Sequence, residues 1–135
     1  MKQQSKLILL SNDDGYLAPG INLLIEWLRP LARIVVVAPD GPRSGGGGWI
    51  TATVPITSTL VRREEGLEVY ACSGTPVDCV KLALHALVPR EPDLVVSGIN
   101  HGDNASINVH YSGTLGAAIE GALHGLRSVA FSSCD

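Results

Sequence analysis

Short apolar runs alternate along this chain with segments of helical periodicity. The runs are "KLILL" at residues 6–10, "RIVVVA" at 33–38, "DLVVSG" at 93–98 and "SVAFSS" at 128–133. They are apolar on both faces, which is typical of strands in a sheet that helices cover on both sides. The alternation therefore predicts an α/β fold with a Rossmann-like, mostly parallel sheet and helices on both of its faces.

The segments between these runs predict three helices, each with one apolar stripe. The first starts near Pro19 and carries Ile21, Leu24, Ile25, Leu28 and Leu31. The second has a capping box of Thr75 and Asp78, with Pro76 in its first turn and Val77, Val80, Leu84 and Leu87 facing inward. The third has Leu115, Ala118, Ile119, Ala122, Leu123 and Leu126 on one face, Glu120 and His124 off it, and Gly125 at its end.

Residues 48–72 break this pattern, because they are rich in Thr, Val and Ile and contain a Glu-Gly turn. We expect a strand pair inserted there.

The 135 residues fit a single domain over 1–135. A net charge of −3, with the basic pair Arg62-Arg63 followed at once by two glutamates, argues against a nucleic-acid surface.

No apolar run is long enough to span a bilayer, and the N-terminal "MKQQSK" lacks the apolar core of a signal peptide. We therefore expect a cytoplasmic protein without a membrane partner.

Cys72, Cys79 and Cys134 form no C-x-x-C pair, and an odd number of cysteines suits reduced, packed thiols better than a disulfide framework.

Polar clusters follow three of the predicted strands: "SNDDG", "PDGPRSGGGG" and "SGINHGDN". The carboxyl ends of parallel strands share one edge of a sheet, so these clusters should meet in space. Their side chains, Asp13, Asp14, Ser44, Asn100, Asp103 and Asn104, are nearly all oxygen donors. Mg²⁺ and Mn²⁺ prefer such ligands, and a cation would offset the repulsion between the adjacent aspartates. An ordinary Asp-Asp-Gly turn is the competing interpretation.

A further polar stretch, "YSGTLGAA" at residues 111–118, leads into the third predicted helix. Backbone N–H groups and hydroxyls at a helix N-terminus bind anions such as phosphate. An ordinary Ser or Thr cap explains the same residues.

Five blocks of this sequence, taken in order, resemble the SurE (survival protein E) family of metal-dependent 5'-nucleotidases. They are "ILLSNDDGYLAPGI", "VVVAPDGPRSGGGGWIT", "GTPVDCVKLAL", "PDLVVSGINHGDN" and "YSGTLGAAIEGAL". The resemblance implies an acid-phosphatase-like phosphoric monoester hydrolase that acts on nucleoside 5'-monophosphates or other small phosphomonoesters.

The same resemblance implies one divalent cation per chain, Mg²⁺ or Mn²⁺, held by Asp13, Asp14, Ser44 and Asn100, with Asp13 and Asp14 also catalytic. It implies that Asn104, Ser112, Gly113 and Thr114 hold the substrate phosphate. Family members are longer, so this chain corresponds to the N-terminal part of the full family chain. The remaining part is expected to complete the sheet and to supply an arm for a homodimer or homotetramer.

Competing functions remain open at this point. Phosphoacceptor receiver domains also place an acidic pair after their first strand, but they need a lysine ending their last strand, and "SVAFSS" has none. A dinucleotide-binding oxidoreductase would need G-x-G-x-x-G after the first strand, and no such motif follows "KLILL". A metal-binding fragment without activity is a further alternative.

Overall fold

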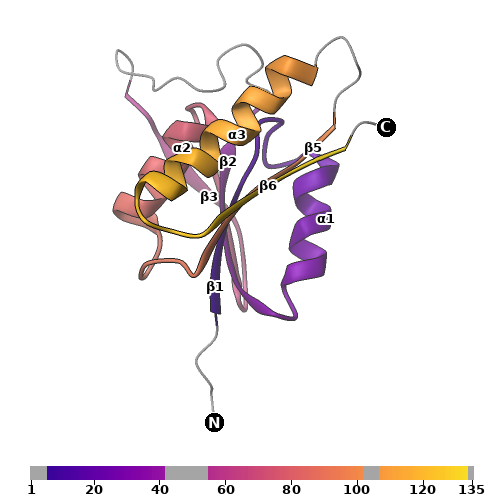
Figure 1. Ribbon diagram of the computed structural model, residues 1–135. Coiled ribbons are helices and arrows are strands. Elements are labelled where there is room, and N and C mark those ends of the chain that lie inside the picture. The colour runs from indigo at the N-terminus through magenta and orange to yellow at the C-terminus, as the bar shows by residue number, and fades with distance from the viewer. Residues whose placement is uncertain (1–5, 42–54, 102–106, 134–135) are drawn as a thin grey trace.

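The computed structural model describes residues 6–41, 55–101 and 107–133 (Figure 1). Side chains are described for the same ranges except 101, 107–113 and 133. One six-stranded sheet forms the centre, with strand order β3-β4-β2-β1-β5-β6. The strands are β1 (Lys6–Ser11), β2 (Ala32–Pro39), β3 (Ser58–Glu64), β4 (Leu67–Cys72), β5 (Leu94–His101) and β6 (Ser128–Ser133). All neighbouring strands are parallel except β3 and β4, which are antiparallel.

The predicted α/β class and the inserted strand pair are confirmed. The pair β3–β4 turns at Glu65-Gly66, where Gly66 has a φ of +76° that an L-residue with a Cβ rarely adopts. Only β4 pairs with the parallel part of the sheet, through β2, and β3 lies at the edge.

The sheet is covered on both faces (Figure 1). One face carries α1 (Pro19–Leu28), and the other carries α2 (Pro76–Leu82), its π-helical continuation η1 (Ala83–Leu87) and α3 (Ile107–Leu123). Alternate residues of β1 and β2 feed two separate apolar cores. Ile8, Leu10 and Ile34 pack with Ile21 of α1, whereas Leu7, Leu9 and Val35 pack with Val80 of α2 and Ala117 of α3. This two-sided burial is why these strands read as continuous apolar runs.

The order of the strands places a topological switch point between β1 and β5. After β1 the chain turns to β2 on one side, and it later returns to place β5 on the other side. In open α/β sheets the carboxyl ends of the strands at such a switch point form the usual ligand crevice. The polar residues that follow β1 and lie in β5 are at this position.

The ends of the helices are set by the predicted capping residues. At the start of α2 the Thr75 side chain accepts from the backbone N–H of Asp78, and the Asp78 carboxylate accepts from the N–H of Thr75. At the end of α3, Gly125 has a φ of +80°, and the N–H groups of Gly125 and Leu126 donate back to Ala122 and Gly121. This pair of bonds is a Schellman motif.

The buried face of α3 differs from the one predicted. Ile119 and Leu123 are more than half exposed, and Glu120 is only 6% exposed. Small residues face the sheet instead: a Cβ added to Gly121 would lie 3.0 Å from Val95 and 2.6 Å from the Ser128 hydroxyl. The helix sits so close to β5 that large side chains are displaced to its flanks.

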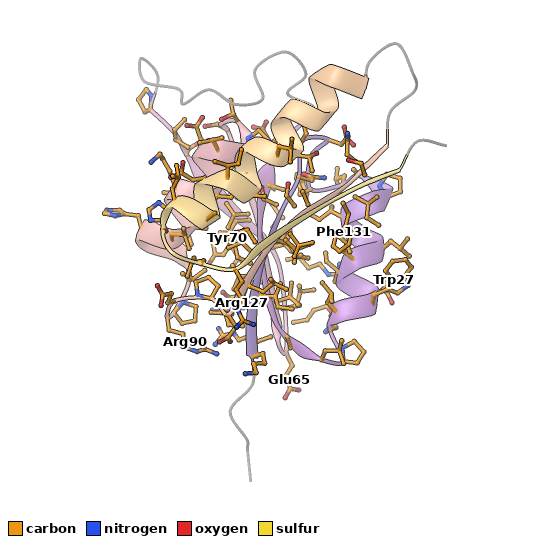
Figure 2. The ribbon with its side chains drawn as sticks, viewed as in Figure 1. Trp27, Glu65, Tyr70, Arg90, Arg127 and Phe131 are labelled. Carbon is orange, nitrogen blue, oxygen red and sulfur yellow. The ribbon has the colours of Figure 1, made fainter. Side chains whose placement is uncertain are left out.

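Two further predictions about burial are wrong. Leu31 is 71% exposed, because α1 ends at Leu28 and the stripe ends with it. Strand β6 is an edge strand of the described sheet, so its Val129 and Phe131 remain 37% and 45% exposed. They line an apolar groove of about 210 Å³ that Trp27 of α1 also borders (Figure 2).

No helix within the described ranges is long and apolar enough to cross a membrane.

Candidate active site at the carboxyl edge of the sheet

The turn that carries Asp13 and Asp14 follows directly on β1 and is braced by Asn12. The Asn12 side chain is buried, donates to the carbonyl of Gly15 at 2.8 Å and accepts from the Gly15 N–H at 3.1 Å. An asparagine that bonds the backbone three residues on closes the chain into a tight loop. Both aspartates therefore occupy a fixed loop at the end of β1.

This turn is also held against the end of β2. The N–H of Tyr16 donates to the carbonyl of Pro39 at 3.0 Å. Gly15 has a φ of +108°, and a Cβ added there would lie 3.3 Å from the Cα of Gly41. The predicted meeting of the first and second polar clusters is thus supported as far as Gly41, the last described residue before 42–54.

The two aspartates differ in exposure. Asp13 is 2% exposed, whereas Asp14 is partly exposed. Burial of a carboxylate disfavours its charged form unless a cation or hydrogen-bond donors compensate. The two neighbouring carboxyl groups therefore lie in different environments: Asp13 is buried and Asp14 is partly exposed.

Strand β5 forms the other wall of the candidate site. Ser11 at the end of β1 pairs in register with Ser97 of β5, and both side chains are fully buried. Asn100 is 2% exposed and lies within β5, opposite Ser132 of β6, rather than in the loop expected after the strand. The strand runs three residues further than predicted, from 98 to His101.

Close packing of α1 against β5 holds this wall in place. A Cβ added to Gly20 in the first turn of α1 would lie 2.2 Å from the carbonyl oxygen of Ile99. Only a glycine permits that approach, because real Cβ atoms do not come within 3.0 Å of another atom. The neighbouring Asn100 is consequently fixed relative to the start of α1.

Thr114 faces the same region from α3. Gly121 lies on Val95, and α3 runs antiparallel to β5 because it connects β5 to the parallel strand β6. Thr114 comes seven residues earlier, about 10 Å along the helix axis, and so lies toward the carboxyl edge of the sheet. Its side chain is fully buried.

One part of the phosphate-site prediction is wrong. Residues 112–114 were expected at the N-terminus of the third helix, but α3 begins at Ile107, so they lie within it. Backbone N–H groups beyond the first four of a helix bond to carbonyls of the preceding turn. The backbone N–H groups of Ser112, Gly113 and Thr114 are therefore unavailable to an anion. A donor to phosphate from these three residues must be a side-chain hydroxyl. Ser106, which immediately precedes the helix in the sequence, is a residue type that commonly caps helices.

Several buried oxygens at this edge have no hydrogen-bond partner among the described residues. They are the Oγ atoms of Ser11 and Ser97, the Oδ1 of Asn100 and the Oγ1 of Thr114. A buried polar atom without a partner destabilises a fold by about 1–3 kcal/mol, and such atoms in native proteins usually mark a bound water, ion or ligand. Ser11, Asn12 and Ser97 were not predicted as site residues, although the Ser-Asn preceding Asp-Asp-Gly is a recognisable turn signal.

The donor set fits a hard divalent cation. Asp13, Asp14 and Asn100 offer carboxylate and amide oxygens, which Mg²⁺ and Mn²⁺ prefer. Within the described residues no three His, Cys, Asp or Glu side chains gather as a metal cluster. A cation at this edge would therefore take amide, hydroxyl or water oxygens beside the two carboxylates. The predicted ligand Ser44 and the predicted phosphate ligand Asn104 lie outside the described residues, as does Asp103.

A family profile described as Survival protein SurE matches residues 8–135 of this chain. The chain belongs to the SurE family. A relative named 5'-nucleotidase SurE from Phocaeicola vulgatus is 61% identical over the whole chain, which covers 52% of that relative. The protein of the same name from Bacteroides thetaiotaomicron is 58% identical, with 52% of its length covered.

A solved structure, the SurE protein from Aquifex aeolicus, matches this fold with a TM-score of 0.80 and 44% sequence identity. The match covers 96% of this chain and 51% of that one. The chain thus spans about half the length of the SurE relatives it matches. Family membership, fold and the shorter length relative to the family agree with what the sequence blocks implied.

Proposed function

We propose that this chain carries the cation- and phosphate-binding part of a divalent-metal-dependent phosphomonoesterase that acts on nucleoside 5'-monophosphates. One observation carries the proposal: a buried, all-oxygen cluster at the β1/β5 switch point of a chain whose relatives are named 5'-nucleotidase SurE. In full length the enzyme would be a homo-oligomer, a dimer or a tetramer.

The proposed cation ligands are Asp13, Asp14 and Asn100, with Ser44 added from the segment after β2. A phosphate dianion would be repelled by two adjacent carboxylates unless positive charge lay between them. Mg²⁺ or Mn²⁺ would supply that charge, neutralise the phosphoryl oxygens and lower the pKa of a bound water. The fixed turn braced by Asn12 holds the carboxylates ready for this role without rearrangement.

The two aspartates would divide the work according to their exposure. Buried Asp13 would hold the cation, and partly exposed Asp14 would also orient the attacking water and accept its proton. The Thr114 hydroxyl would donate to a phosphoryl oxygen as negative charge develops there. Asn104 and the hydroxyl of Ser112 remain proposed as further contacts to the phosphate, and Gly113 remains proposed as the residue whose missing side chain leaves room for it.

The test is an assay of 5'-monophosphates, 3'-monophosphates and p-nitrophenyl phosphate with EDTA, Mg²⁺ or Mn²⁺. It uses this chain and, beside it, this chain extended by the C-terminal half of the Phocaeicola vulgatus relative. We expect metal-dependent turnover that falls about 100-fold or more in the Asp13→Asn and Asp14→Asn variants. The control Glu26→Gln removes an exposed carboxylate on α1 and should leave turnover unchanged.

Three outcomes would count against the proposal. Turnover that survives both aspartate substitutions would place the chemistry elsewhere. Binding of Mn²⁺ without turnover in the extended chain would favour a non-hydrolytic module. Equal turnover of 3'- and 5'-monophosphates would remove the proposed substrate preference.

A further inference from the structure

Two buried cysteines meet beside the candidate site. Cys72 is the last residue of β4, and Cys79 lies one turn into α2. Both are fully buried, and both belong to the apolar core that contains Leu9 and Val37. The Cys79 thiol donates a hydrogen bond to the Cys72 sulfur, so the two side chains are in direct contact. The sequence predicted packing thiols and did not predict their pairing.

The surroundings of Cys72 favour its thiolate. The Gly74 N–H donates to its sulfur at 3.4 Å, in addition to the bond from Cys79. The Cys79 hydrogen bond lowers the pKa of the Cys72 thiol to about 7, against the opposing effect of burial and with help from Gly74. A thiolate is the nucleophilic form of cysteine, so Cys72 is the attacking member of the pair.

The turn between the two cysteines is firmly held. Thr75 and Asp78 form the reciprocal capping box, and the Ser73 N–H donates to the carbonyl of Thr57 at 2.9 Å. The hydrogen bond of Ser73 anchors the start of this turn, and the capping box anchors its end. Cys72 and Cys79 are therefore held next to each other in the folded chain.

We propose that Cys72 and Cys79 are a redox pair that hydrogen peroxide converts into a disulfide joining β4 to α2. The Cys72 thiolate attacks one peroxide oxygen and becomes a sulfenic acid, with the other oxygen leaving as water after protonation. The Cys79 sulfur then displaces hydroxide from the Cys72 sulfur, and that hydroxide takes the Cys79 proton and leaves as water. Two thiols and one peroxide thus give one disulfide and two waters.

The oxidised pair would act on the candidate active site through the backbone. The carbonyl of Cys72 accepts from the N–H of Asp40 at 2.8 Å, and Cys72 pairs in register with Pro39. Pro39 in turn accepts from Tyr16 in the Asp13-Asp14 turn. A disulfide that moves the end of β4 therefore shifts the end of β2 and the aspartate turn. This consequence, unlike the bond itself, rests on the proposed function.

Mass spectrometry tests the bond directly. Hydrogen peroxide is added to the folded chain, remaining thiols are blocked with N-ethylmaleimide in denaturant, and trypsin then releases residues 64–81 with both cysteines in one peptide. We expect this peptide to lose the mass of two hydrogens and to take no label, reversibly with dithiothreitol. The same result is expected in Cys134→Ser, which removes the remaining cysteine. Full labelling of both cysteines, or a link from either one to Cys134, would overturn the proposal.

The Cys79→Ser variant separates the two steps. It should stop at a Cys72 sulfenic acid that dimedone traps, and failure to trap it would exclude Cys72 as the attacking thiol. If circular dichroism shows that this variant does not fold, the wild-type peptide mass still decides the proposal. In the extended chain, metal-dependent turnover should fall on oxidation and return with dithiothreitol. A disulfide without any change in turnover would overturn the coupling to the site and leave the redox pair standing.

Discussion

Gly20 of α1 lies directly on the backbone of Ile99 in β5, so that a Cβ at position 20 would lie 2.2 Å from the Ile99 carbonyl oxygen. The contact joins the helix that follows the Asp13-Asp14 turn to the strand that carries Asn100. It therefore sets the separation of the two walls of the candidate site. A change at Gly20 should act on the fold and on the site together.

Gly20→Ala should lower the free energy of unfolding by about 3 kcal/mol, because a backbone atom cannot move away as a flexible side chain can. Urea unfolding followed by circular dichroism measures this. Gly66→Ala is the matched control, because a Cβ added to Gly66 would meet no atom within 4 Å, although the residue has a φ of +76°. This substitution should lower the free energy of unfolding by about 1 kcal/mol. Equal effects at the two positions would show that α1 can withdraw from β5.

Asn12→Asp should destabilise the metal-free chain and make its stability strongly dependent on divalent cation. The new carboxylate keeps the bond from the Gly15 N–H but faces the Gly15 carbonyl, to which Asn12 now donates at 2.8 Å. It also adds a negative charge beside Asp13 and Asp14. We expect a loss of about 1–3 kcal/mol and a larger rise of Tm with Mn²⁺ than in the wild type. Thermal unfolding with EDTA and with Mn²⁺ measures both, and equal Mn²⁺ shifts would contradict the predicted cation site.

Much of the fold could be predicted because its signals are local. The apolar runs that became β1 and β2 are buried on both sides, and Thr75 and Asp78 form the predicted capping box. The face of α3 could not be predicted from periodicity. What decides it is the fit of Gly121 against Val95, a contact between residues far apart in the sequence.

The candidate site shows the same division. Asp13 and Asp14 could be found from the position of an acidic pair at a strand end. The neighbouring Ser11 and Ser97 could not, because only the register of β1 against β5 makes them partners in a buried, oxygen-lined edge. The start of α3 was misplaced because Ser112 and Thr114 are cap-forming residue types that here lie inside the helix.

Thr114→Val should stabilise the metal-free chain while lowering activity. Valine matches threonine in shape, and it removes a buried hydroxyl oxygen that has no partner among the described residues. We expect a gain of about 1 kcal/mol in the free energy of unfolding. In the extended chain, turnover of a 5'-monophosphate should fall, and Thr114→Ser should restore most of it by returning the hydroxyl. A loss of stability in Thr114→Val would indicate that the hydroxyl is bonded in the metal-free protein.

Stability between pH 5 and pH 3 should depend on Glu120. Burial raises the pKa of this carboxyl, but hydrogen bonds from Lys81 at 2.8 Å and His124 at 3.0 Å outweigh burial and hold it below its ordinary 4.5. Because the folded-state pKa is lower than the unfolded one, the contact adds stability above the unfolded pKa. That stability is lost as the pH falls through the folded-state pKa.

Lys81→Met removes the stronger of the two partners and should lower the free energy of unfolding at pH 7 by about 1–2 kcal/mol, a modest loss because Lys81 is itself partly exposed. In this variant burial opposes the charged form with less compensation, so the pKa of Glu120 rises toward or above its unfolded-state value and the acid-induced loss of stability from this carboxyl should shrink or reverse. Urea unfolding at pH 7, 5, 4 and 3 measures the trend. Glu120→Gln is the matched control, because it cannot titrate and should lack this part of the acid dependence. An identical acid dependence in wild type and Glu120→Gln would show that another carboxyl controls acid stability.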